Sequence, residues 1–244
     1  MEYRRLRKQK RYLRFVIFLG TLAFLAFAIL MSPLLQISHI YVEGNVAVSD
    51  GQILQQISFA TGQNMLSFNA GANRSSIEAL PYIHHASVLR SFPDSIVISV
   101  TERTPVANIR LGNTNTHLLI DEFGMVLQSG GEPLDGRLVA TGMVFSHFAV
   151  GEYLVVDNPA VFDNILLLSR IFSRYDFFPD IIDISDPFDI TLHIGNTNIY
   201  FGGIQDADRK IQYLQAISQE FPLGVRGYIY IKDLSVRPRF GLIR

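Results

Sequence analysis

The most pronounced pattern in the chain is an uncharged apolar run from Phe15 to Leu35, preceded by a basic tip over residues 1–14. Thirteen of the run's twenty-one residues are Leu, Ile, Phe or Val. As a helix the run would be roughly 31 Å long, which matches a hydrocarbon core of about 30 Å. The pattern therefore predicts a single transmembrane helix over residues 15–35 and disfavours a helix of a soluble core.

A cleaved signal peptide would need a shorter apolar run followed by small residues at a cleavage site. Here the run ends in Met31-Ser32-Pro33 without an A-x-A pattern, so an uncleaved anchor is expected. The tip holds seven Lys or Arg against one Glu. Because basic residues beside a span stay on the cytoplasmic side, the tip is expected in the cytoplasm and everything after Leu35 outside the membrane.

After the run, residues 36–106 begin with a strand and a short helix. Ile37 to Glu43 has β-type composition and stops at a Gly-Asn turn signal. Ser49 stands three residues ahead of Gln52, which is the spacing of a capping box, and apolar residues then recur at helical spacing until Gly62.

A second short helix and a hairpin complete this region. Asn69 offers a cap before the second helix, and Pro81 marks its end. The runs 86–90 and 95–101 flank Pro93-Asp94, which suits a turn between antiparallel strands. The predicted order is β-α-α-β-β, with two helices covering one face of a small sheet.

Residues 107–244 carry turn signals between strand-like runs. The sequence GNTN occurs at 112–115 and again at 195–198, and Asp121-Glu122-Phe123-Gly124 lies between two further apolar runs. Asn and Gly tolerate positive φ, so each of these stretches is expected to turn a hairpin. A second, α+β domain with a largely antiparallel sheet is therefore predicted.

Two amphipathic helices are expected in the same domain. One opens at Asn158-Pro159 with Val161, Ile165, Leu168 and Phe172 on one stripe, and it continues to Tyr175. The other opens at Asp206, with Ala207, Ile211, Leu214 and Ile217 at helical spacing. Both stripes predict helices packed against a sheet.

Composition excludes several classes of chemistry. Beyond the tip, fourteen Lys and Arg face twenty-one Asp and Glu, so this part is acidic and a nucleic-acid partner is not expected. There is no Cys, no nucleotide-binding or hydrolase motif, and the six His are scattered. We therefore predict no enzyme, cofactor, metal site or small-molecule substrate.

Two pairs of adjacent charged residues are not expected to be catalytic. Asp121-Glu122 lies in a predicted turn, where a solvated tip is expected instead of an acid-base pair. Glu102 and Arg103 are neighbours on a strand and point to opposite faces, so we expect them to be solvated or paired with neighbouring residues.

The last predicted strand runs from Gly227 to Leu234. A terminal strand commonly lies at a sheet edge, where its unpaired backbone groups accept another chain's strand. Basic residues and proline at an edge also prevent such pairing, and both follow this strand. These physical considerations do not decide whether the edge binds another chain's strand or is protected from such pairing.

The first domain resembles a POTRA domain, and more narrowly that of the bacterial division family FtsQ/DivIB. The resemblance rests on the following stretches: Ile40 to Asn45, Leu80 to Ile83, Val88 to Arg90, Phe92 to Asp94, and Val100 to Ala107, which ends in E-R-x-P-x-A. A basic tip, one span, this domain and then a β-rich domain are that family's layout.

The resemblance implies a non-enzymatic protein at the division septum. It would bind membrane partners of the FtsB/DivIC and FtsL type outside the cytoplasmic membrane and bring septal peptidoglycan synthesis to the division site. In the family the partners dock on the last strand and its extension, which implies partner contacts at Leu234, Val236, Arg237 and Phe240. The alternative is a POTRA-containing protein transport or outer-membrane assembly factor.

Overall fold

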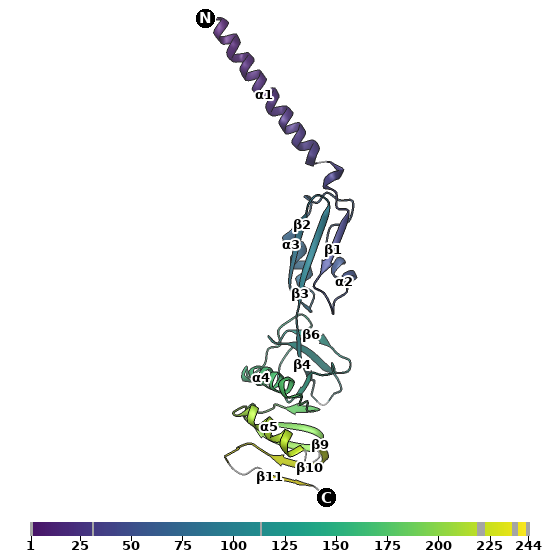
Figure 1. Ribbon diagram of the computed structural model, residues 1–244, viewed down its shortest axis with the longest axis vertical. Helices are drawn as coiled ribbons and strands as arrows, with labels where there is room; N and C mark the ends of the chain where they lie inside the picture. The colour runs from purple at the N-terminus through teal and green to yellow at the C-terminus, as the bar shows by residue number, and fades with distance from the viewer. Residues whose placement is uncertain (1, 31, 113, 219–222, 236–238, 243–244) are drawn as a thin grey trace. The chain divides into compact units, whose positions relative to one another are not determined.

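Two units make up the chain, Met1–Glu102 and Arg103–Arg244, in a computed structural model that describes residues 2–30, 32–112, 114–218, 223–235 and 239–242. The elements of the first unit are, in order, α1 (Glu2–Leu30), η1 (Pro33–Leu35), β1 (His39–Glu43), α2 (Asp50–Leu54), α3 (Ala70–Glu78), β2 (Ile83–Ser91) and β3 (Ser95–Glu102). Figure 1 shows both units with their elements labelled.

The first unit has the predicted β-α-α-β-β order. Its three-stranded sheet has the order β1-β3-β2, with β1 parallel and β2 antiparallel to β3. Ser49 and Gln52 form the predicted capping box, in which the Ser49 N–H donates to Gln52 Oε1 at 3.0 Å. Asn69 caps α3 by accepting the Ala72 N–H at 3.1 Å. The first helix ends at Leu54, earlier than the predicted Gly62.

Both helices cover the same face of this sheet. Ile53 of α2 and Ile77 of α3 are fully buried in one core with Ile96 and Ile98 of β3. These strand residues alternate with half-buried ones, which gives the period of two expected of a sheet with one solvated face. The two-layer packing predicted from the sequence is therefore confirmed.

Glu102 at the end of β3 is bound to the loop that precedes α2. Its carboxylate accepts the backbone N–H groups of Val46, Ala47 and Val48 at 2.8–3.1 Å. Desolvation of the carboxylate acts in the opposite direction, but the three hydrogen bonds outweigh it and hold the pKa of Glu102 below its ordinary value. The expectation of pairing with neighbouring residues is confirmed for this residue.

We expect Glu102→Gln to lower the free energy of unfolding of the first unit by about 1–2 kcal/mol at pH 7, because a charged acceptor is lost. A carboxylate with a depressed pKa stabilises the fold above its unfolded pKa, and this contribution is lost as pH falls through the folded value. The difference between wild type and variant should therefore shrink below about pH 4. Thermal melts followed by circular dichroism at pH 7 and pH 3 measure it, and a difference independent of pH would contradict the charge-based explanation.

Helix α1 begins before the predicted span of residues 15–35 and also ends before it. It begins at Glu2, within the basic tip, and closes at Leu30. Pro33 then begins the short helix η1, and Ser32 Oγ accepts the Leu34 N–H at 3.2 Å. Among the residues described by the structure, no helix combines the length and hydropathy of a membrane span. The transmembrane helix over 15–35 stays a prediction.

The elements of the second unit are β4 (Pro105–Arg110), β5 (His117–Asp121), β6 (Val126–Ser129), β7 (Leu138–Thr141), α4 (Ala160–Tyr175), β8 (Ile181–Asp183), β9 (Ile190–Gly202), α5 (Ala207–Ser218), β10 (Gly224–Tyr230) and β11 (Arg239–Leu242). The division between the units falls between Glu102 and Arg103, whereas the sequence analysis ended the first domain at Val106. Pro105 instead begins β4, where it pairs with Asp121 of β5.

The eight strands form one sheet in the order β11-β10-β9-β8-β7-β4-β5-β6. The sheet is mixed: the pairs β4–β7, β7–β8 and β9–β10 are parallel and the other four are antiparallel, so the prediction of a largely antiparallel sheet is confirmed only in part. Helix α4 lies in the chain between β7 and β8, and α5 lies between β9 and β10. A crossover helix returns the chain in the same direction and so produces parallel neighbours.

The second GNTN stretch turns the chain as predicted, although it lies inside β9. The first half of β9 pairs with β8 over Thr191 to His193, and the second half pairs with β10 from Gly195 onward. His193 Nδ1 lies 2.9 Å from Asn198 Oδ1, whereas five residues of one extended strand would span roughly 16 Å. The first GNTN stretch likewise connects two antiparallel strands, β4 and β5.

Both helices of this unit pack on the sheet as predicted. Val161, Ile165, Leu168 and Phe172 of α4 are buried, as are Ala207, Ile211, Leu214 and Ile217 of α5. They share one hydrophobic core with the inward side chains of the strands. One face of the large sheet is thus covered by helices, while its two edges differ from each other.

Candidate partner-docking edge

One edge of the large sheet, formed by β6, is covered by the chain that follows it. The Val126 N–H donates to Glu152 O at 2.9 Å, and the Gly151 N–H donates to Val126 O at 2.8 Å. Met125 also forms an antiparallel bridge with Tyr153. These contacts occupy the backbone groups on which another strand would pair.

The other edge is β11, which pairs antiparallel with β10 on its inner side. Among residues 2–30, 32–112, 114–218, 223–235 and 239–242, no strand pairs with its outer side. It also carries large apolar side chains toward solvent, since Phe240 is 50% and Leu242 is 65% exposed. An uncovered strand with exposed apolar residues is a template for strand addition.

The register assigns the side chains of β11 to the two sheet faces. Phe240 lies opposite Ile229, which is fully buried in the core, so both are on the face that the helices cover. Gly241 lies opposite Tyr228 on the other face, where the Tyr228 ring is so close that a Cβ on Gly241 would be about 3.1 Å from it. Phe240 therefore lies at the open edge on the same side of the sheet as the core.

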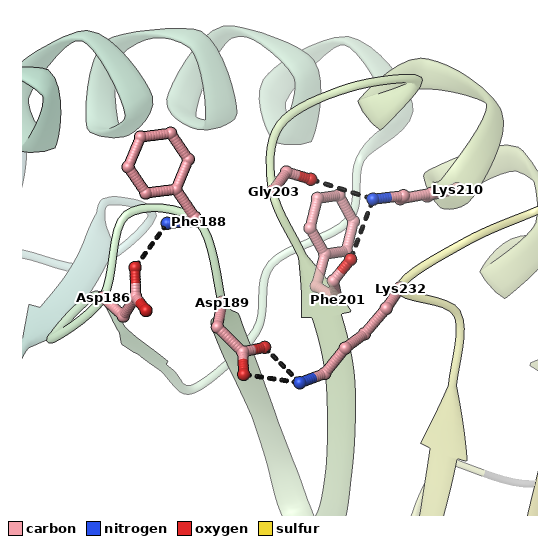
Figure 2. Close-up of polar contacts among 7 residues, drawn as sticks. All are labelled: Asp186, Phe188, Asp189, Phe201, Gly203, Lys210 and Lys232. Carbon is pink, nitrogen blue, oxygen red and sulfur yellow. Dashed lines mark hydrogen bonds and ion pairs between the residues drawn. The ribbon is translucent and has the colours of Figure 1, made fainter.

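Two lysines bind residues at the start and the end of β9, as Figure 2 shows. The Lys210 ammonium donates to the carbonyls of Phe201 and Gly203, both at 2.8 Å, although the residue is only 2% exposed. Lys232 pairs with Asp189 and lies 5.5 Å from the centroid of the Tyr230 ring.

The two ammonium groups differ in their electrostatic environment. Desolvation by burial lowers the pKa of Lys210, and the charges of Asp206 and Asp233 oppose this only in part. The hydrogen bond to Asp189 raises the pKa of Lys232. Lys210 was not expected to be buried from the sequence. Its place beside Ile211 in the buried stripe of α5 is the feature that could have indicated it.

The predicted contact residues lie at different places. Phe240 is on the open edge, and Leu234 is half-buried and packs against the core of the second unit. Val236 and Arg237 lie outside the described residues. The edge strand itself, β11, follows the strand that the sequence analysis expected to be the last.

Asp121 is not the solvated tip that the sequence suggested. It is 3% exposed, accepts the N–H groups of Phe123 and Met125 at 2.8 Å, and pairs with Arg103 Nη1 at 2.8 Å. The Arg103 side chain is itself only 10% exposed. The pair fixes the tip of the β5–β6 hairpin, and its carboxylate is already committed to structural contacts.

The distribution of possible metal ligands bears on a second kind of site. Within the described part of the chain, no three His, Cys, Asp or Glu side chains lie close enough together to hold a metal ion. His193, considered as a lone strand histidine, is within hydrogen-bonding distance of Asn198 Oδ1 at 2.9 Å. The arrangement of this unit offers an edge for binding a polypeptide more clearly than a site for chemistry.

A small sheet covered by two helices, followed by a unit with an open-edged mixed sheet, defines a POTRA-containing protein. The profile described as "POTRA domain, FtsQ-type" matches residues 35–103. A "Cell division protein FtsQ" of Novosphingobium aromaticivorans is 32% identical over 109 residues, which cover 44% of this chain and 33% of that protein.

Two further relatives extend the comparison. A "Cell division protein FtsQ" of Corynebacterium glutamicum is 25% identical over 175 residues, or 71% of this chain and 74% of the relative. A "Cell division protein DivIB" of Clostridium acetobutylicum is 32% identical over 96 residues, or 39% of this chain and 38% of the relative. The matched region is thus about a third of the Novosphingobium protein and three quarters of the Corynebacterium protein. Residues 35–103 thus match the FtsQ-type POTRA domain, and the chain is similar to FtsQ and DivIB cell division proteins.

Proposed function

We propose that this chain is a non-enzymatic, single-pass division protein that binds partner membrane proteins of the FtsB/DivIC and FtsL type outside the cytoplasmic membrane. Through them it would bring septal peptidoglycan synthesis to the division site. The observation that carries the proposal is the uncovered strand β11 with its exposed Phe240 and Leu242. A partner segment would add to β11 as a further strand.

The proposed membrane anchor is the apolar part of α1 within residues 15–35. Its support is the length of the uncharged run together with the exposure of large apolar side chains along α1, among them Phe18, Leu22 and Leu25. The basic residues of the tip would keep the N-terminus in the cytoplasm. In this arrangement 36–106 is the POTRA domain, and 107–244 is the FtsQ/DivIB-type β domain that carries the partner-binding strand.

A fluorescent fusion to the N-terminus is expected to form rings at midcell in dividing cells. Protease added to intact spheroplasts is expected to digest the C-terminal unit of the fusion protein and to leave the N-terminal fluorescent tag, which is in the cytoplasm, intact. A uniform envelope signal would favour the alternative function in protein transport or outer-membrane assembly. Protection of the C-terminal unit from protease would contradict the proposed topology.

A further inference from the structure

The end of the β4–β5 hairpin carries two basic side chains with unpartnered, buried nitrogen atoms. Arg110 and His117 lie directly opposite each other in the register of the two strands. Side chains opposite each other in an antiparallel pair project from the same face, with Cβ atoms about 5 Å apart. Among the described residues, neither Arg110 Nε nor His117 Nδ1 has a hydrogen-bond partner, and both atoms are buried.

These two side chains lie on the sheet face away from α4 and α5. Their sequence neighbours Ile109 and Leu118 are buried in the core beneath the helices, and alternation sends Arg110 and His117 to the other face. The segment after β6 is bound next to these residues at two points. The Gly130 N–H donates to His117 O at 2.9 Å, and the Asn108 side chain both accepts from and donates to the backbone of Leu134.

No carboxylate neutralises Arg110 within the described part of the chain. The ion pairs found there involve other cations, and Glu132 and Asp135 of the segment after β6 form none with Arg110. His117 is 6% exposed, so its ring is withdrawn from solvent. Buried polar atoms are normally satisfied, so the Arg110 Nε–H donor and the His117 Nδ1 atom, side by side on one sheet face, are two polar groups that lack a partner.

We propose that Arg110 and His117 form a binding site for a carboxylate. One carboxylate oxygen would accept from the Arg110 guanidinium and the other from the N–H of His117, in the geometry that makes arginine the usual partner of planar oxyanions. The carboxylate is supplied either by a small free anion or by a Glu side chain of a bound peptide. The site is separate from the β11 edge and does not depend on partner docking there.

The test uses the full chain in detergent micelles with ¹⁵N-labelled histidine, and it follows the ring nitrogens by NMR at pH 7. One arm titrates sodium acetate against sodium chloride at constant ionic strength. The other titrates a blocked Gly-Glu-Gly peptide against its Gln analogue. The matched variant is Arg110→Gln, because Arg110 is only partly buried and the substitution removes the charge with little change in size.

The expected result is a saturable shift of the His117 ring signal in at least one carboxylate arm, with an apparent Kd at least tenfold weaker in Arg110→Gln. Equal affinity for acetate and peptide identifies a free anion as sufficient, and a peptide that binds tenfold more tightly identifies a peptide-borne carboxylate. Unchanged signals from the other histidines show that the variant is folded. No saturable shift in either arm, or the same shift in Arg110→Gln, would overturn the proposal.

Discussion

Replacing Arg103 by methionine is expected to lower the free energy of unfolding of the second unit by about 3–5 kcal/mol. The substitution leaves the Asp121 carboxylate, which is only 3% exposed, without its counter-charge. Removing one member of a buried ion pair costs this much because the remaining charge is poorly solvated. Hydrogen exchange measured by mass spectrometry separates the two units and should show faster exchange in the second unit and unchanged exchange in the first.

A surface ion pair of the same unit provides the control. Arg170 and Glu122 are 3.8 Å apart and well exposed, so Arg170→Met should change stability by less than about 0.5 kcal/mol. The double variant Arg103→Met, Asp121→Asn should recover part of the loss, because the stranded charge is gone while the side-chain oxygen still accepts backbone N–H groups. If Arg103→Met costs less than about 1 kcal/mol, the Asp121 hydrogen bonds alone sustain the buried charge.

The second large effect is expected at the open edge. Phe240→Ala should weaken binding of the FtsB- or DivIC-type partner by about 30-fold, which corresponds to about 2 kcal/mol and is typical of a central aromatic contact. The reason is that Phe240 lies on the strand to which the partner would add, on the helix-covered side of the sheet, and its side chain is 50% exposed before binding. Biolayer interferometry with the partner's extracytoplasmic segment measures the change.

Phe188→Ala is the matched control for this experiment. Phe188 lies in the loop before β9, outside β11, and is 72% exposed, so the same loss of ring area should leave affinity unchanged. The circular dichroism of both variants should match that of the wild type. Normal binding by Phe240→Ala would show that Phe240 does not contribute to partner binding. Equal weakening by Phe188→Ala would show that the effect is not local to β11.

Local sequence patterns predicted the helices and strands of this chain better than they predicted which strands pair with each other. The capping box at Ser49, the stripes of α4 and α5 and the order of the first unit follow from spacing within a few residues of sequence. Parallel pairing of β4 with β7 joins strands from distant parts of the sequence, and nothing in either strand encodes it. The two helices were predicted from the sequence, but the parallel pairing of the strands that they connect was not, because the neighbouring turn signals favoured antiparallel hairpins.

The error at Asp121 has a clear physical origin. Asp121 has the composition of a solvated turn, yet a cation eighteen residues earlier makes its burial tolerable. GNTN at 195–198, by contrast, follows its local turn chemistry. A distant partner can therefore override a local preference, and for the same reason the candidate edge could be expected near the C-terminus while its strand, β11, could not be assigned.

The covered β6 edge has a consequence for stoichiometry. A sheet with two bare edges can grow at both ends and form an open fibre, whereas this sheet offers one unoccupied edge among its described strands. Assembly by strand addition therefore ends after one event for each chain. A second copy pairing through the same edge would compete with a foreign strand, so that the two complexes exclude each other instead of joining into a polymer.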